Sequence, residues 1–309
     1  MNCIHCSEKA VIELQHGALC KNHFLSHFED RVFTTINRYK MLGPDDLICV
    51  ATSGGKDSLT VLYLTQKYIK KHKYKNAAVF ALAVDEGIEN YREKTLQDLT
   101  KFCTEHNVPL TIVKSKDTFN KTLDETYQTI TEKKNKKPCH VCGVWRRYLL
   151  NKTAKEMGAT KIVTGHNLDD EAQAIMMNIF KANTSLAGRL GPVSGIKENE
   201  HFTSRVKPLY LCPEKEVRLY ALLKGFQVHF AECPYSKEGY RHHIQEMLNN
   251  FEEQYKGTKQ GIVRSFLAIL PLLKEAQKEE KIINTCTLCG EATSKEICNA
   301  CAMKEELMT

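Results

Sequence analysis

An α/β fold built on an open parallel sheet is predicted by three observations on this 309-residue chain. Short apolar runs alternate with longer segments of helical spacing between residues 47 and 164, the rhythm of βαβ units. The first run leads into Ser53-Gly54-Gly55, and two glycines allow a tight turn from a strand into a helix. Cysteines gather in pairs near both termini, which predicts a small zinc-binding module at each end of the sheet domain.

The individual elements follow from these patterns. Strands are expected at residues 47–52, 77–84, 110–113 and 161–164, and helices at 58–71, 90–106, 118–133 and 145–157. The run over 77–84 is apolar throughout, which suits a parallel strand buried on both faces. Beyond Gly191 the pattern becomes helical, with helices expected at 214–223, 239–255 and 261–274. Ligands of such a sheet bind at the carboxyl ends of its strands.

The composition is that of an ordinary globular protein, with 42% hydrophobic and 26% charged residues. The first residues do not resemble a signal peptide, and no apolar stretch approaches membrane-spanning length, so we expect a cytoplasmic protein without a membrane partner. Thirteen cysteines would suggest disulfides in a secreted chain. Their CxxC pairing favours metal ligation under reducing conditions instead.

The net charge of +7 suits a polyanionic partner without requiring one. Positive residues cluster at 133–137, beside a CxxC pair, and at Arg241-His242-His243. Such runs usually form solvated faces, and phosphate binding is the alternative that nearby chemistry would favour.

The segment 53–58, Ser-Gly-Gly-Lys-Asp-Ser, is a candidate phosphate-binding loop. Free backbone N–H groups and the positive end of a helix dipole both attract phosphate. The Walker A pattern does not fit, because Val50 stands where it requires glycine and Asp57 stands where it requires Ser or Thr. The segment resembles instead the SGGxDS loop of the ATP pyrophosphatases, which cleave ATP to AMP and pyrophosphate. An ordinary glycine-rich turn is the alternative.

Acidic residues follow two of the predicted strands. Asp85 stands with a glycine at the end of the second, and Asp169, Asp170 and Glu171 open the helix after the fourth. An acidic trio at this place can simply cap the helix and match its dipole. Asp170 can equally hold the Mg²⁺ that ATP chemistry requires.

Two cysteine clusters have the spacing of tetrahedral zinc sites, because each short-spaced pair spans one edge of the metal. The N-terminal set is Cys3, Cys6, Cys20 and His23, and the C-terminal set is Cys286, Cys289, Cys298 and Cys301. We predict one Zn²⁺ in each, in modules over residues 1–28 and 281–309 that are too small to fold without metal. For the N-terminal set the alternative is a surface histidine with spare cysteines.

A third cluster, Cys139-His140-Val141-Cys142, stands alone, and its next candidate partner is Cys233. Three interpretations are open. These are a structural zinc site with His140, a redox disulfide between Cys139 and Cys142, and an iron–sulfur cluster in which one iron lacks a protein ligand. Three further cysteines have no assigned function: Cys49, which we expect in the core, Cys103 and Cys212.

Together these motifs resemble the tRNA 2-thiouridine synthetases of the TtuA and cytoplasmic tRNA 2-thiolation group. The resemblance spans nearly the whole chain and is carried by the loop 53–58, the segment 165–171, the cysteine trio and both zinc sets, extending to 205–209 and 233–235. It implies the PP-loop type of sheet, like that of adenine nucleotide alpha hydrolases. The ATP-binding catalytic domain would span 29–200, and a helical part of the catalytic and tRNA-binding region would span 201–280.

The resemblance also implies an activity, that of a tRNA uridine 2-sulfurtransferase. ATP, held with Mg²⁺ by the loop, would adenylate the carbon-2 oxygen of the uridine and release pyrophosphate; sulfur would then attack and AMP would leave. In such enzymes Cys139, Cys142 and Cys233 would hold a 4Fe-4S cluster. The catalytic residues implied are these cysteines with Lys56, Asp57 and Asp170. The nucleotide contacts implied are Ala51, Ser53, Gly54, Gly55, Lys56, Asp57, Ser58, Ala83, Asp85, Arg146, Gly165 and Asp170.

In some members of the family a lysine replaces Arg146, and arginine keeps that charge but cannot act as a base. The partners implied are tRNA and a sulfur donor, either sulfide or a ubiquitin-like thiocarboxylate protein, in a homodimer. Frequent asparagine and modest charge density do not look thermophilic, which favours the wobble uridine over the T-loop uridine. The rival hypotheses are a persulfide-type tRNA thiolase without a cluster and a zinc-finger RNA-binding adaptor without turnover. The intact loop 53–58 argues against the adaptor.

Overall fold

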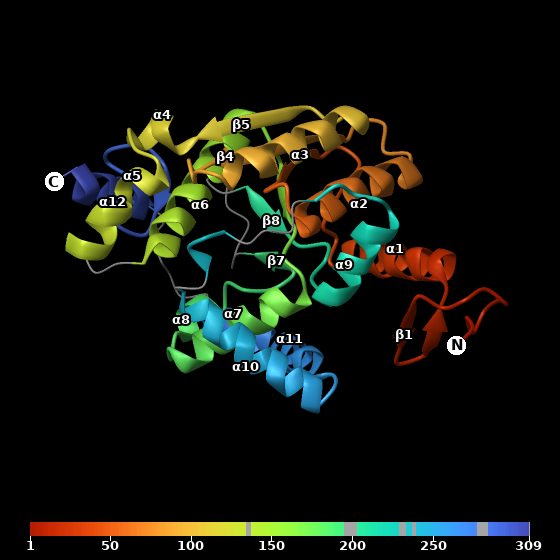
Figure 1. Ribbon diagram of the computed structural model, residues 1–309. Coiled ribbons are helices and arrows are strands. Elements are labelled where there is room, and N and C mark those ends of the chain that lie inside the picture. Colours follow the sequence, from red (N-terminus) through yellow and green to blue (C-terminus); the bar gives the residue numbers. More distant parts are fainter. Residues whose placement is uncertain (134–136, 195–202, 229–232, 237–238, 277–283, 309) are drawn as a thin grey trace.

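A computed structural model of the chain describes residues 1–133, 137–194, 203–228, 233–236, 239–276 and 284–308 (Figure 1). Its centre is a six-stranded sheet in the order β5-β4-β3-β6-β8-β7. The strands are β3 (Leu47–Ala51), β4 (Ala78–Asp85), β5 (Leu110–Lys114), β6 (Lys161–Thr164), β7 (Val193–Ser194) and β8 (Ser204–Val206). All neighbours are parallel except β7 and β8. The predicted open parallel sheet and its four strands are therefore confirmed, and the short strands β7 and β8 are additions.

Helices cover both faces of the sheet. Along β3, successive side chains point to opposite faces. Ile48 and Val50 pack in the core that includes α2 (Lys56–His72), whereas Cys49 packs with Ala154 of α6 (Pro138–Glu156). Cys49 is fully buried, as expected of a core residue. The remaining covering helices are α1 (Lys21–Arg38), which was not predicted, α3 (Arg92–Glu105) and α9 (Glu214–Leu223).

One predicted helix is wrong. The segment 118–133 forms α4 (Ser115–Phe119), α5 (Leu123–Gln128) and a π-helical turn (Thr129–Lys133). Asn120 ends α4 with a φ of 59°, in the left-handed region that asparagine tolerates. Thr122 then starts α5 through a capping box with Glu125.

The helix expected at 145–157 begins earlier, at Pro138, the position where proline suits a helix start. Cys139 and Cys142 therefore lie in its opening turns rather than in a loop. A different group of helices packs beside the sheet: α7 (Leu168–Phe180), α8 (Thr184–Ala187), α10 (Tyr240–Gln254) and α11 (Thr258–Ala276). Figure 1 shows α7, α10 and α11 gathered below the sheet, around a core of their own.

The two terminal modules lie at opposite ends of the molecule (Figure 1). The N-terminal one is the hairpin of β1 (Ile12–Leu14) and β2 (Gly17–Leu19), and the C-terminal one joins β9 (Asn284–Thr285), β10 (Ala292–Thr293) and α12 (Asn299–Met308). Each hairpin pairs no more than three residues per strand, so hydrogen bonding alone cannot stabilise it. Among the described residues, no helix has the length and apolar character needed to cross a membrane.

Candidate functional site

The phosphate loop joins β3 to α2 in a conformation that requires glycine. Gly54 has a φ of 82°, and a Cβ at this position would collide with the backbone oxygen of Thr95. The hydroxyl of Ser58 accepts a hydrogen bond from the Ser53 N–H at 3.2 Å and donates to the Gly55 carbonyl at 2.9 Å. The loop is thereby closed on the first turn of α2, and the amides of that turn face the edge where β3 ends.

The end of β6 touches the same turn. Ala51 pairs with Thr164, and a Cβ on Gly165 would lie 2.9 Å from the carbonyl group of Asp57. Gly165 is therefore required for this close approach. Its place beside the loop supports the sequence interpretation that both belong to one nucleotide site.

Lys56 lies between two carboxylates. Its Nζ is 3.0 Å from Asp57 Oδ2 and 2.8 Å from Glu214 Oε1 at the start of α9. Burial lowers the pKa of the Lys56 ammonium, but the two carboxylates outweigh this effect and raise the pKa overall. Burial also raises the pKa of Asp57, although Lys56 opposes that shift. The lysine stays charged, and Glu214 is a partner of Lys56 that the sequence did not reveal.

Asp170 caps α7, which was one of the two functions that the sequence analysis considered for it. It forms a capping box with Asn167, and its Oδ1 also pairs with Arg241 at 2.8 Å. The Asn167 amide in turn donates to Asp57 Oδ1 at 3.1 Å, which links Asp170 to the phosphate loop. Asp169 is buried and accepts hydrogen bonds from the Glu214 N–H and from Lys259 of α11. Asp170 therefore caps the helix, and magnesium binding by its carboxylate stays a prediction.

The carboxyl end of β4 carries a buried acid that the sequence analysis missed. Asp85 accepts a hydrogen bond from the Gly87 N–H, a local turn, whereas Glu86 is 5% exposed. Glu86 Oε2 lies 3.0 Å from Arg92 Nε and its Oε1 lies 3.3 Å from Arg146 Nε. The sequence signal for a functional acid here was a carboxylate at the end of a buried strand. It fits Asp85 and Glu86 equally, and only the fold distinguishes them.

Ala83 lies two residues before Asp85 in β4 and is fully buried in the sheet core. Its side chain faces packing helices, so only its backbone can approach a nucleotide. The remaining predicted nucleotide residues, from Ala51 through Ser58 with Gly165 and Asp170, lie along the carboxyl ends of β3 and β6.

Cys139 and Cys142 of α6 come close to the segment 233–236. The Cys139 thiol donates to the Tyr235 carbonyl at 3.2 Å, and both thiols of α6 interact electrostatically with Cys233. Among the described residues, groups of ligand atoms within 4.8 Å of one another occur at the two termini and not at this trio. Sulfurs around a single tetrahedral ion with bonds near 2.3 Å are only about 3.8 Å apart. The three sulfurs are therefore not gathered as one tetrahedral ion would require, and a cluster at this trio stays a prediction.

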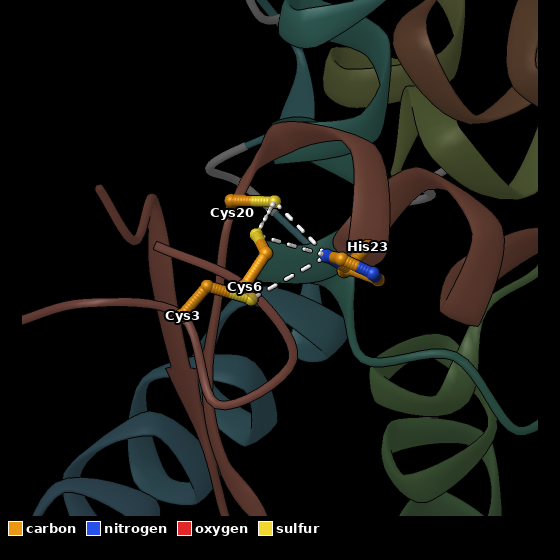
Figure 2. Close-up of side chains that lie close together, drawn as sticks. All are labelled: Cys3, Cys6, Cys20 and His23. Carbon is orange, nitrogen blue, oxygen red and sulfur yellow. Dashed lines mark hydrogen bonds between the residues drawn. The ribbon is translucent and has the colours of Figure 1, made fainter. Parts of the chain in front are cut away.

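Both terminal ligand sets have the geometry of a single-ion site. Figure 2 shows Cys3, Cys6, Cys20 and His23 pointing toward one another. The Sγ atoms of Cys6 and Cys20 are 3.6 Å apart, and His23 Nδ1 lies 3.2 to 3.5 Å from the three sulfurs. At the other end, Cys289 and Cys298 are 3.7 Å apart. The predicted ligands of each set, including Cys286 and Cys301, lie together in positions that could hold a metal ion.

The C-terminal module packs directly on α6, the helix that carries Cys139 and Cys142. Trp145 of α6 is 1% exposed and stacks on Phe119 at 4.5 Å. The core around Trp145 contains the C-terminal cysteines Cys286 and Cys298, and Cys142 and Cys233 pack against the same core. Lys304 of α12 donates to the Thr118 carbonyl at 2.8 Å.

Two predicted basic runs have different outcomes. Residues 134–136 lie outside the described residues, so the run 133–137 cannot be placed on the surface. Arg241 of the second run is engaged by Asp170 and by Gln173, whereas His243 remains exposed next to Glu246. In the segment 205–209, Lys207 forms a buried ion pair of 2.7 Å with Glu171.

Comparisons with known proteins agree with this geometry. A family model described as a PP-loop domain matches residues 25–244. A tRNA-5-methyluridine(54) 2-sulfurtransferase from Pyrococcus horikoshii is 36% identical over 99% of this chain and 96% of its own. The tRNA 2-thiolation protein NcsA from Haloferax volcanii is 33% identical over 99% of both chains. A solved structure, the U34-tRNA thiolase NcsA from Methanococcus maripaludis with its [4Fe-4S] cluster, is 31% identical with a TM-score of 0.83 over 99% of this chain and 96% of that one.

Proposed function

Because this chain belongs to the PP-loop family of tRNA 2-thiolation sulfurtransferases, we propose that it replaces the carbon-2 oxygen of the wobble uridine of tRNA with sulfur. The observation that carries the proposal is the junction of an intact phosphate loop with a cysteine trio, linked through Arg92, Glu86 and Arg146. Such a junction serves a reaction that uses ATP and sulfur at one place.

The phosphate loop would bind ATP. Amides of residues 53–58 and the ammonium of Lys56 offset the phosphate charge, and Lys56 would exchange its contact with Glu214 for one with phosphate. Asp57 and Asp170, joined through Asn167, would hold Mg²⁺. Adenylation of the uridine oxygen releases pyrophosphate and converts that oxygen into part of a good leaving group, AMP.

Cys139, Cys142 and Cys233 would hold a 4Fe-4S cluster, whose iron without a protein ligand would supply bound sulfide for transfer. The chain's own residues set the geometry around that position. Arg146 stands one helical turn after Cys142 and places a permanent positive charge between the cysteines and the nucleotide end of the sheet. Arginine stabilises negative charge on the attacking sulfur and the departing AMP, and it does not act as a base.

Each terminal module would hold one Zn²⁺. Cys3, Cys6, Cys20 and His23 form one ligand set, and the four C-terminal cysteines form the other. The ion would stabilise the short hairpins and has no part in the chemistry. The other partners we propose are tRNA, a sulfur donor that is sulfide or a ubiquitin-like thiocarboxylate protein, and a second copy of the chain, in the cytoplasm.

The T-loop uridine is the second candidate position, since the Pyrococcus horikoshii relative is named for uridine 54 and the Methanococcus maripaludis thiolase for uridine 34. One experiment tests both. Anaerobically purified protein is incubated with unmodified tRNA, ATP, Mg²⁺ and sulfide, and the tRNA is digested and mapped by mass spectrometry. We expect 2-thiouridine at the wobble position. Thiolation in the T loop would move the target, and absence of any thiolated uridine would overturn the function.

A further inference from the structure

Glu86 is buried at the nucleotide end of the sheet and is held through its backbone as well as through its carboxylate. Its carbonyl accepts from the Leu123 N–H at 2.8 Å. The next residue, Gly87, has a φ of 68° and lies so close to Thr122 that a Cβ would collide with its side chain. The backbone around Glu86 is therefore fixed against the start of α5.

Arg92 ties that carboxylate to the phosphate loop. Arg92 is 4% exposed and donates to the carbonyls of Val84 and Ser53 as well as to Glu86. A buried guanidinium with this many acceptors has little freedom to move. Glu86 thus stands at a constant position relative to Ser53 in the loop.

Arg146 is held differently. Its Nε lies 3.3 Å from Glu86, while 48% of its side chain is exposed. It stands four residues after Cys142, on the same face of α6. Arg146 therefore lies between the cysteine end of α6 and the buried Glu86, with part of its side chain open to solvent.

We propose that Glu86 is a positioning residue that aims Arg146 at the reacting uridine and so fixes the sulfur-delivery helix in register with the phosphate loop. This inference rests on the proposed function. Sulfur transfer requires the attacking atom and the adenylated carbon to be aligned, and misplacement by about 1 Å can lower a rate about 100-fold. Glu86 serves this alignment without touching the substrate.

The test compares Glu86→Gln, Glu86→Asp and Arg146→Gln in the full-length protein with its cluster. Glu86→Asp keeps a negative charge but is one methylene shorter, so it cannot bridge Arg92 and Arg146 at the present distances. It guards against a Glu86→Gln protein that fails to fold. The two Glu86 changes should lower the turnover of tRNA thiolation about 10- to 100-fold, leave the KM for ATP within about twofold, and keep iron content at the wild-type level. Arg146→Gln should lower the turnover at least as far and also keep its iron. The control is Glu89→Gln, an exposed acid three residues later, which should behave like wild type.

The double variant Glu86→Asp with Arg146→Gln decides between positioning and independent effects. If Glu86 acts through Arg146, the double variant is no slower than Arg146→Gln alone. Multiplied losses, or a Glu86→Asp protein with normal turnover, would overturn the inference.

A second readout does not depend on activity. In cluster-free protein, phenylglyoxal labelling of Arg146, followed by mass spectrometry, should be several-fold faster in Glu86→Asp than in wild type, while Arg147 on the same helix is unchanged. Equal labelling of Arg146 would overturn the positioning function. If wild-type protein thiolates no tRNA, the proposed function fails, and the labelling result still decides whether Glu86 holds Arg146.

Discussion

The ammonium of Lys56 lies 2.8 Å from the carboxylate of Glu214, a residue 158 positions later in the chain. The side chains are 18% and 39% exposed, so both lie at the edge of the site. Lys56 belongs to the phosphate loop, where the start of α2 attracts anions. Glu214 therefore supplies a negative charge at a place suited to phosphate, and a bound ATP would have to displace it.

Removing that competitor should strengthen ATP binding. A partly exposed ion pair is worth about 0.2 to 1 kcal/mol, so Glu214→Gln should lower the KM for ATP by a factor of about 1.5 to 5. Steady-state pyrophosphate release with tRNA present measures this. Lys215→Gln, the exposed neighbour, is the control. A KM that rises in Glu214→Gln would mean that the carboxylate helps to hold the nucleotide or its metal.

Gly54→Ala should abolish ATP binding through a steric effect. The new methyl group would collide with the Thr95 backbone oxygen, so the loop must leave its position. Gly225→Ala is a matched control, because Gly225 also has a positive φ, 74°, but has no atom within 4 Å of its added Cβ. Backbone strain alone should cost Gly225→Ala about 1 kcal/mol of unfolding free energy and leave ATP affinity unchanged. Calorimetric ATP titration of both proteins tests this, and tight binding by Gly54→Ala would contradict the loop geometry.

Loss of the C-terminal zinc should weaken the cysteine trio. Cys298→Ser removes a ligand from the module that packs against Trp145 and Cys142, so the start of α6 should loosen. We expect faster hydrogen exchange over 138–156 and less iron retained after anaerobic purification.

The matched control removes the other zinc site. Cys20→Ser disrupts a module whose core is continuous with Phe24 and Phe28 of α1, away from α6. It should lose one zinc and keep its iron. Equal iron loss in both variants would mean that zinc acts through general stability rather than through contact with α6.

The sequence predicts most of the elements that position the site, because their signals are local. The positions of its glycines predict the loop 53–58, and an unbroken apolar run predicts the strand at 77–84. The prediction of one helix over 118–133 is wrong because hydrophobic periodicity does not reveal the helix end at Asn120 or the helix cap at Thr122. Strands of two or three residues, such as β7, are too short to have a pattern.

The site shows the same division. Both terminal ligand sets follow from spacing, since ligands within a pair are close in the chain. Contacts over long separations were not predicted: Lys56 with Glu214, and Glu86 with Arg146. The neighbouring acids Asp85 and Glu86 cannot be told apart in the sequence. Successive side chains at the end of a strand point to opposite sides, and only the fold shows that Glu86 is the buried one.

The most direct test of the central claim is metal analysis of anaerobically purified wild-type protein beside Cys233→Ala. Wild type should contain about four iron atoms per chain, with the broad visible absorption of an iron–sulfur cluster, together with about two zinc atoms. Cys233→Ala should lose the iron and the absorption while its zinc content stays the same. Wild-type protein that carries zinc at the trio and no iron, or a Cys233→Ala protein that keeps its cluster, would contradict the account.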